Sequence, residues 1–459
     1  MSVRPLRRVL IANRGEIAVR IARACFDEGI ACVAAVSDGD RDSLAARLAD
    51  STICIGPAAA AKSYLHIPAV IGAALASGCD ALHPGYGFLS ERAELAQACA
   101  DHGIAFIGPP ATVIRRGGNK VAARVLAREL DIPVGEGSDA IADVAHARAL
   151  AAGIGYPVLL KAAAGGGGRG MVKVADGESL LEAYARAANE AHAAFGDGTL
   201  FMERYLANAR HVEVQILADT LGQVIHLGER DCTCQRRYQK LIEEAPASAL
   251  SLRLRDALCA AAVRLARALG YVSAGTMEFL VDLDRESFAF LEVNTRVQVE
   301  HPVTEMVTGV DIVREQLRIA AGLPLSVTQQ QVRLNGHAIE CRLNAESAAA
   351  GFMPSPGRIE RWTVPQGAGI RVDTHCFDGY VVGAEYDSML AKLICHGRDR
   401  ADALARMHRG LGRVRVAGVD TTAELQRALV GHGDFRANLH TTRWVEEHFL
   451  PAWNAHSAA

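Results

Sequence analysis

Short apolar runs alternate with amphipathic helical stretches through the first third of this chain. The apolar runs are residues 9–12, 31–36, 81–83 and 105–107, and the helical stretches are residues 16–28, 67–77 and 91–102. Strands that alternate with helices predict a parallel, doubly wound sheet. Ligands bind beyond the carboxyl ends of the strands in such sheets, so we expect functional residues in segments 13–16 and 83–87.

Two common nucleotide-binding patterns are incomplete in this part of the chain. The first apolar run is followed by a single glycine, Gly15, where a dinucleotide-binding loop has three spaced glycines. Residues 56–63 nearly match a phosphate-binding loop, but Ala61 stands in place of the second glycine. We therefore interpret residues 56–63 as a surface loop, and the sequence disfavours both a dehydrogenase and a phosphate-loop NTPase.

The composition is that of a near-neutral globular protein. Its 459 residues suggest about two to four domains. A net charge of −3 indicates no nucleic-acid or membrane partner, because both require excess basic charge. The 11 cysteines show no C-x-x-C spacing, which favours buried thiols in a reducing compartment. The apolar run after the basic N-terminus is too short for a signal peptide, and no uncharged apolar run reaches about 18 residues, so we expect a soluble cytoplasmic protein.

A glycine-rich run lies between two predicted strands, residues 157–161 and 171–174. Gly165 to Gly168, Arg169 and Gly170 follow one another there. The backbone N–H groups of such a loop can close over a polyphosphate, whereas in a flexible linker the glycines would be spacers. Lys161 just before the run and Arg169 within it favour phosphate binding.

Two alternating segments, 276–283 and 287–294, predict a hairpin that brings two glutamates together. If the chain folds back about Arg285, Glu278 and Glu292 face each other. Directly opposed side chains lie about 5 Å apart, and like charges there are destabilising. A divalent cation such as Mg²⁺ resolves the repulsion, and Asn294 on the same face offers a third oxygen.

The alternative is two solvated glutamates on an exposed sheet face. Metal binding is favoured because a polar cluster follows directly: Arg296, Gln298, Glu300 and His301. A basic cluster after residues 229–232, made of Arg236, Arg237 and Lys240, is either a solvated charged loop or an anion-binding set beside the metal. On spacing alone, Arg342 in the predicted strand 338–343 is a structural ion-pair member rather than a catalytic group.

Together these segments resemble biotin carboxylase, a member of the ATP-grasp superfamily, over roughly residues 8–449. The matching segments are residues 11–18, 83–91, 165–171, 229–232, 292–302 and 354–357. The resemblance implies an α/β, three-domain ATP-grasp architecture. An N-terminal doubly wound parallel sheet covers residues 1–117, an ATP-grasp domain covers 118–330 with a mobile lid at about 134–206, and a C-terminal α+β domain covers 336–449.

The resemblance also implies a role for each site residue. ATP would contact Lys120, Lys161, Gly166, Gly167, Gly168, Glu203, Leu206, His211, Gln235, Glu278 and Glu292. Two Mg²⁺ or Mn²⁺ ions would be held by Glu278, Glu292 and Asn294. Bicarbonate and biotin would contact Lys240, Arg296, Gln298, the backbone of Val299, Arg342 and Tyr86. Among these residues Lys240 and Arg296 would be catalytic, Glu300 would deprotonate bicarbonate, and Arg342 would stabilise the biotin enolate, which reverses the expectation from spacing.

The implied reaction is ATP- and bicarbonate-dependent carboxylation of biotin through carboxyphosphate. None of the eight methionines begins a Met-Lys-Met biotinylation site, so biotin is expected on a separate biotin carboxyl carrier protein. Carboxyltransferase subunits would be further partners, as in the separate-subunit acetyl-CoA carboxylase, and the chain is expected to form a homodimer. Two alternatives stay open: another ATP-grasp ligase with an acyl or carboxy phosphate intermediate, and a non-catalytic nucleotide-binding scaffold.

The sequence departs from the family pattern at four positions. Asn119 replaces Asp, Tyr238 replaces His, Ala164 replaces Gly and Arg92 replaces Asn. The substitution at Tyr238 is the most serious, because the imidazole that it replaces lies near the nucleotide phosphates in the family. We expect Tyr238 to weaken or retune ATP binding.

Overall fold

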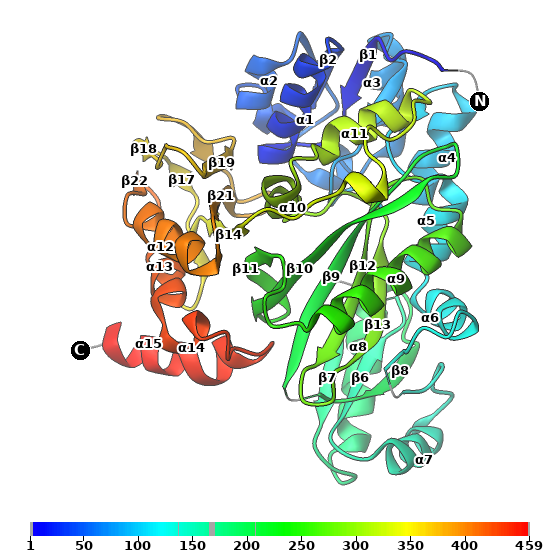
Figure 1. Cartoon of the computed structure of the whole chain (residues 1–459). Coiled ribbons are helices and arrows are strands. Elements are labelled where there is room, and N and C mark those ends of the chain that lie inside the picture. The colour runs from blue at the N-terminus through cyan, green and yellow to red at the C-terminus, as the bar shows by residue number, and fades with distance from the viewer. Residues whose placement is uncertain (1–2, 136, 165–169, 207, 458–459) are drawn as a thin grey trace.

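The computed structural model describes residues 3–135, 137–164, 170–206 and 208–457 (Figure 1). The N-terminal region forms a five-stranded parallel sheet in the order β3-β2-β1-β4-β5. The strands are β1 (Arg8–Ile11), β2 (Ala31–Val36), β3 (Ser51–Cys54), β4 (Ala81–His83) and β5 (Ala105–Phe106). The helices between them are α1 (Gly15–Asp27), α2 (Leu44–Leu48), α3 (Ile67–Ala76) and α4 (Ala93–Asp101).

The predicted doubly wound sheet is confirmed. Val9 and Ile11 of β1 pack in one hydrophobic core with α1, whereas Leu10 packs in a second core with α3 and α4 on the other face. The loops at the carboxyl ends of β1 and β4 meet there, because the Asn13 amide donates hydrogen bonds to the backbone carbonyls of Pro84 (2.6 Å) and Tyr86 (2.8 Å). This edge of the sheet faces the rest of the molecule (Figure 1).

An eight-stranded antiparallel sheet joins the middle and the C-terminal parts of the chain. Its order is β13-β12-β9-β10-β11-β14-β21-β19. Its strands are β9 (Ala209–Ala218), β10 (Val224–Arg236), β11 (Gln239–Ala245), β12 (Ser273–Asp282), β13 (Ser287–Asn294), β14 (His337–Asn344), β19 (Ile370–Thr374) and β21 (Met389–Gly397). The pairing of β11 with β14 makes the sheet continuous across the two regions.

Helices cover both faces of this sheet. Helices α5 (Ala111–Gly118), α6 (Lys120–Glu129) and α9 (Leu252–Leu269) pack on the β9–β13 half, and α12 (Arg400–Leu411) and α13 (Ala423–Gly431) pack on the C-terminal half. Helix α10 (His301–Thr308) contacts β10, β11, β14 and β21, and α11 (Ile312–Ala320) returns to α1. No helix in the described part of the chain is long and apolar enough to cross a membrane.

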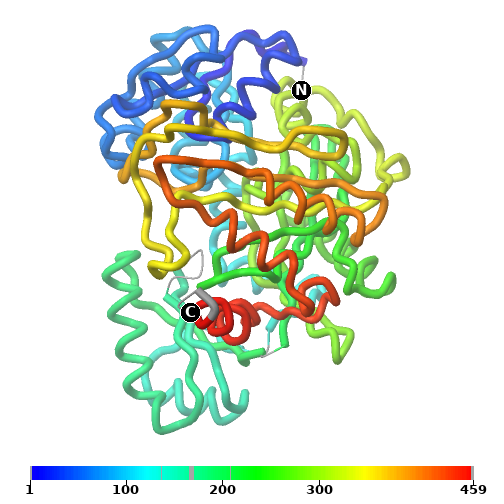
Figure 2. Tube along the Cα trace, turned by 90° about the vertical axis from the view of Figure 1, so that its left-hand side faces the viewer, coloured from blue at the N-terminus to red at the C-terminus, as the bar shows by residue number. Residues whose placement is uncertain are grey.

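A smaller unit with its own hydrophobic core lies at one end of the molecule. Its three-stranded sheet has the order β7-β6-β8, with β6 (Val158–Ala162), β7 (Met171–Val174) and β8 (Leu200–Arg204), and it carries α7 (Val144–Ile154) and α8 (Leu180–Phe195). Figure 2 shows this unit as a separate lobe below the large sheet. Gly165 to Gly168 and Arg169 of the predicted phosphate loop lie outside the described residues.

The hairpin of β12 and β13 brings Glu278 and Glu292 opposite each other, as predicted. The register differs nearer the turn, where Phe279 faces Phe290, so the simple fold about Arg285 is wrong there. A bulge between the two registers adds one residue to β13 and restores the predicted pairing at the glutamates. The side chains at the turn end instead form an aromatic cluster in the core under α9.

Gly275 provides a test of how tightly this hairpin packs. A Cβ atom at Gly275 would lie 2.0 Å from the Tyr271 hydroxyl oxygen, which hydrogen-bonds the Ala274 carbonyl. We expect Gly275→Ala to lower the free energy of unfolding by about 1–3 kcal/mol, because such overpacking forces the backbone to shift. Denaturant unfolding measures the change. Gly72→Ala is the control: it lies in α3 with open space around it and should stabilise the protein by about 0.5–1 kcal/mol. Equal stability of the two variants would contradict this packing.

Candidate active site

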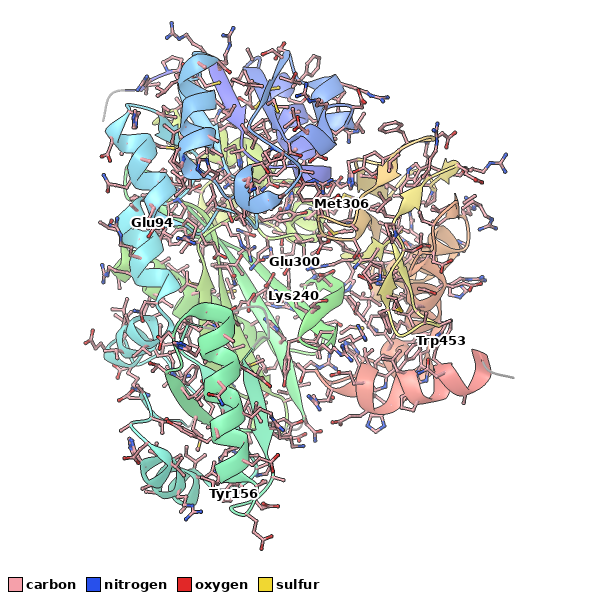
Figure 3. All side chains as sticks on the ribbon, turned by 180° about the vertical axis from the view of Figure 1, so that it is seen from behind. Glu94, Tyr156, Lys240, Glu300, Met306 and Trp453 are labelled. Atoms are coloured by element: carbon pink, nitrogen blue, oxygen red, sulfur yellow. The ribbon has the colours of Figure 1, made fainter. Side chains whose placement is uncertain are left out.

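A lysine surrounded by three carboxylates lies at the centre of the molecule. The Lys240 ammonium donates hydrogen bonds to Glu213 (2.6 Å), Glu278 (2.9 Å) and Glu300 (2.6 Å). Strands β9, β11 and β12 supply three of these residues, and Glu300 precedes α10. Figure 3 shows Lys240 and Glu300 close together where the N-terminal region meets the large sheet. Burial lowers the pKa of Lys240, but the neighbouring carboxylates outweigh it and raise that pKa well above its usual value.

Arg342 reaches the same cluster from β14. Its guanidinium donates to Glu243 (2.6 Å) and to the second carboxylate oxygen of Glu300 (3.1 Å). Burial raises the pKa of Glu300, yet Lys240 and Arg342 hold it below the usual range, so this carboxylate stays ionised. Burial, reinforced by the charge of Glu300, raises the pKa of Glu243 to about 7 although Arg342 opposes the shift. Arg342 is therefore a member of a buried ion pair, as spacing alone predicts. It also contacts Glu300, the residue that the resemblance implies as the base.

Arg230 of β10 contacts the same cluster, although the sequence alone did not indicate a site role for it. Its side chain is fully buried and its guanidinium donates to Glu213, to Gln215 (2.8 Å) and to Thr304 (2.9 Å). The alternation of His211, Glu213 and Gln215 along β9 was the available signal, because it places acceptors on a face that needs a cation.

The proposed metal donors lie beside the same cluster. Glu278 contacts Lys240, the His211 imidazole (3.0 Å) and, more distantly, the Gln298 amide (3.4 Å). Glu292 forms an ion pair with Lys120 at 2.8 Å. Asn294 accepts a hydrogen bond from Arg296 (3.3 Å) through its amide oxygen, while its buried amide nitrogen has no hydrogen-bond partner among the described residues.

This donor set fits a hard divalent cation. Two carboxylates in cross-strand register and a neighbouring amide oxygen are the ligand types that Mg²⁺ prefers. Glu213 was not predicted as a donor, yet ligand atoms of His211, Glu213 and Glu278 all lie within 4.8 Å of one another. Glu213 is therefore a further oxygen donor within reach of Glu278.

The cluster that follows β13 is organised by Arg296. Its guanidinium donates to Gln298 (2.7 Å) and to Glu91 (3.1 Å), so it is tied to the N-terminal region. Glu91 was not predicted as a site residue, although it lies in the conspicuous segment 83–91. The carbonyl of Val299 accepts a hydrogen bond from Lys392 (2.8 Å). Arg296, Gln298 and Val299 thus lie in one turn that leads to Glu300.

The residues predicted to contact the nucleotide fall into two groups. In the smaller unit, Glu203 of β8 forms an ion pair with Lys161 of β6, and it also pairs with Arg124 of α6, which was not a predicted nucleotide contact. Burial raises the pKa of Glu203, but the two cations lower it below its usual value. Leu206, just beyond β8, is half-buried. In the second group, on the large sheet, the Gln235 amide contacts the His211 imidazole at 3.3 Å.

The structure defines the surroundings of Tyr86 and of the predicted basic cluster. The Tyr86 hydroxyl donates a hydrogen bond to Glu16, and the Glu16 carboxylate pairs with Lys392 at 3.0 Å. The predicted basic cluster spans the hairpin between β10 and β11, where Arg237 and Tyr238, with φ of 48° and 62°, form a two-residue loop.

Only one of the three basic side chains of that cluster reaches the site. Alternation along the hairpin turns Lys240 inward, whereas Arg237 is exposed and Arg236 lies 3.7 Å over the Phe352 ring. Of the two interpretations, exposed Arg237 fits the solvated charged loop, whereas Lys240 contacts the carboxylate cluster. Asn119, one of the four departures from the family pattern, has a structural role. Its side chain caps α6, next to Lys120, by accepting a hydrogen bond from the Ala122 N–H group.

Comparison with known proteins agrees with this architecture. The family models that match are "Biotin carboxylase, N-terminal domain" over residues 5–114, "Carbamoyl-phosphate synthase L chain, ATP binding domain" over 119–328, and "Biotin carboxylase C-terminal domain" over 340–447. "Biotin carboxylase 1" of Bacillus subtilis is 46% identical over 442 residues, which cover 96% of this chain and 98% of the relative.

Solved structures match equally well. The Campylobacter jejuni biotin carboxylase complex with a β,γ-ATP ligand superposes with a TM-score of 0.94 at 46% identity, covering 96% of this chain and 99% of that one. The biotin carboxylase domain dimer of Hydrogenobacter thermophilus 2-oxoglutarate carboxylase, bound to MgADP, ADP and bicarbonate, superposes with a TM-score of 0.93 at 46% identity, covering 97% and 98%.

The raised pKa of Glu243 makes a prediction about stability. Its folded pKa of about 7 exceeds the ordinary value of 4.5, so the folded state binds its proton more tightly. This contribution to stability is present below about pH 4.5 and is lost as the pH rises through about 7. Denaturant unfolding of wild type and of Glu243→Gln from pH 5 to pH 8 tests this. We expect the midpoint of the variant minus that of wild type to increase as the pH rises.

Glu203→Gln is the control for this measurement. The pKa of Glu203 is lowered in the folded state, so its carboxylate is ionised in both states across that range. Its difference from wild type should stay constant between pH 5 and pH 8. A constant difference for Glu243→Gln as well would contradict the raised pKa.

Proposed function

The chain belongs to the biotin carboxylase family, and from this premise we propose that it catalyses the ATP- and bicarbonate-dependent carboxylation of biotin through carboxyphosphate. The observation that carries the proposal is Glu300, an ionised carboxylate held between Lys240 and Arg342. Biotin is borne by a separate biotin carboxyl carrier protein, and carboxyltransferase subunits use the product. The chain acts as a homodimer, supported by the domain dimer of the Hydrogenobacter relative.

Glu300 is the base in this proposal. Bicarbonate is a weak nucleophile until its proton is removed, and a positioned carboxylate can accept that proton. Arg296, Gln298 and the backbone of Val299 hold bicarbonate in the turn before Glu300, with Lys240 on the other side. As bicarbonate enters, Lys240 divides its charge between the substrate and Glu300, so the proton affinity of Glu300 rises while that of bicarbonate falls.

The nucleotide lies between the smaller unit and the large sheet. Lys161 in β6 and Lys120 at the start of α6 hold its phosphates, and Glu203, Leu206, His211 and Gln235 line the rest of the site. Glu278, Glu292 and Asn294 would hold Mg²⁺, which when bound neutralises charge on the transferring phosphoryl group. On binding ATP, Lys120 and Lys161 exchange their pairing with Glu292 and Glu203 for phosphate oxygens.

Arg342 serves the second half of the reaction. The biotin enolate carries negative charge on its ureido oxygen, and a guanidinium fixed by Glu243 can stabilise it without reorganising. Tyr86 lies at the edge of the N-terminal sheet beside this region and contacts biotin. Closing of the smaller unit over the nucleotide keeps water from the reactive intermediate.

The direct test is an activity measurement on the purified protein. With MgATP, bicarbonate and free biotin, we expect ADP release that depends on biotin and on bicarbonate. No biotin-dependent ADP release would contradict the proposal. ATP turnover with an amine but none with biotin would instead indicate another ATP-grasp ligase.

Two substitutions separate the proposed roles. We expect Glu292→Gln to abolish bicarbonate-dependent ATP cleavage, because it removes a metal ligand. Arg342→Ala should lower biotin carboxylation by about 10²–10³-fold while sparing bicarbonate-dependent ATP cleavage far more. Both activities are measured in parallel, by ADP release and by carboxybiotin formation.

The control for these variants is Arg398→Ala, since Arg398 is exposed and, among the described residues, its ion pair is with Asp402 in the next helix turn. It should leave both activities at wild-type levels. If Arg342→Ala reduced the two activities equally, the enolate role of Arg342 would be wrong.

A further inference from the structure

A second buried lysine, Lys392, lies next to the proposed site and has no role so far. It is in the middle of β21, directly opposite Arg342 of β14 in the strand register. Its side chain is completely buried. The ammonium donates to the backbone carbonyl of Val299 (2.8 Å) and lies 3.0 Å from Glu16 and 3.9 Å from Asp373.

These contacts come from three different parts of the chain. Glu16 belongs to α1 of the N-terminal region, Val299 to the turn before α10, and Lys392 with Asp373 to the C-terminal strands. Burying an ammonium group requires compensating charge. Burial lowers the pKa of Lys392, but the neighbouring carboxylates outweigh it, so this lysine stays charged.

The contact with Val299 acts on the proposed base. Val299 directly precedes Glu300, so a donor on its carbonyl fixes the orientation of the peptide that joins the two residues. That peptide belongs to the turn that carries Arg296 and Gln298. A shift of the carbonyl would move both the bicarbonate-binding turn and the Glu300 carboxylate relative to Lys240.

The second branch leads to the proposed biotin side. One carboxylate oxygen of Glu16 contacts Lys392 and also accepts the hydrogen bond from the Tyr86 hydroxyl. Lys392 thus donates a hydrogen bond to the residue directly before Glu300, and it is linked to Tyr86 through the Glu16 carboxylate. Among the described residues, no other lysine or arginine donates to the Val299 carbonyl.

Resting on the proposed function, we propose that Lys392 is a positioning residue, which sets Glu300 and the bicarbonate-binding turn from the C-terminal strands and aligns Tyr86 through Glu16. It does not touch the reacting atoms. Lys392 determines the positions of Glu300, bicarbonate and biotin. It therefore affects kcat and the KM values for bicarbonate and biotin rather than nucleotide binding.

Lys392→Arg is the sharpest variant, because it keeps the buried charge but carries it on a longer, planar group. We expect it to fold with little loss of stability and to raise the bicarbonate KM by about 3–10-fold, with the ATP KM within about twofold of wild type. Lys392→Met removes the donor altogether and should lower bicarbonate-dependent ATP cleavage further. If Lys392→Met fails to fold, the kinetics of Lys392→Arg decide.

The matched control is Arg400→Lys, the reverse exchange at another buried cation of the C-terminal region. Arg400 pairs with Glu244 and bonds the Phe435 carbonyl, and it has no contact with the proposed site. It should change stability but leave every KM at its wild-type value. Glu16→Gln tests the second branch and should raise the biotin KM more than the bicarbonate KM.

The outcomes distinguish the two levels of the argument. A wild-type protein without biotin-dependent ADP release overturns the proposed function itself. If wild type is active and Lys392→Arg folds with wild-type constants for bicarbonate, the lysine is a purely structural ion-pair member and the inference is wrong. A rise in the ATP KM as large as that in the bicarbonate KM would also overturn it.

Discussion

The arrangement of this site follows from the need to neutralise buried carboxylates. Glu213, Glu278 and Glu300 share one ammonium group, and an isolated ion in such surroundings would be several kcal/mol unfavourable. Lys240 alone cannot compensate three charges, and Arg230 and Arg342 complete the neutralisation from neighbouring strands. Among the described residues Glu243 forms an ion pair with Arg342 alone, and its pKa of about 7 reflects this weaker compensation of its burial. Removing any one cation would leave a buried charge unpaired.

The continuity of the large sheet makes this neutralisation possible. Because β11 pairs with β14, Lys240 and Arg342 are carried on adjacent strands although about a hundred residues separate them in the chain. The next strand, β21, places Lys392 behind the same turn. The N-terminal region contributes from the other side, through Glu16 of α1 and through Glu91, which pairs with Arg296. The site is thus the junction of three regions rather than a feature of one.

Local patterns predicted the parts of this structure that local physics determines. The alternating elements of the N-terminal sheet and the Glu278–Glu292 pair both follow from periodicity within short segments. The partners of Arg342 and the contact of Lys392 with Val299 depend on pairing between distant strands, and no local pattern specifies that register. Spacing alone assigned Arg342 to a structural ion pair, and the enolate role proposed for it comes from the family resemblance. The Glu278–Glu292 pairing was predicted correctly, but it depends on the bulge in β13, which a symmetric hairpin about Arg285 does not include.

The charge balance also bears on how the two halves of the proposed reaction are connected. Before the reaction, Lys240 and Arg342 are both committed to Glu300. In the proposed mechanism Glu300 would become neutral on accepting the bicarbonate proton, so neither cation would still be needed to compensate it. Negative charge would then lie on the bicarbonate oxygens and would later develop on the biotin ureido oxygen. Because electrostatic interactions are strong in a water-poor site, the positive charge of Lys240 and then of Arg342 would stabilise each anion where it forms. Proton transfer to Glu300 would therefore make Arg342 available for the step that follows.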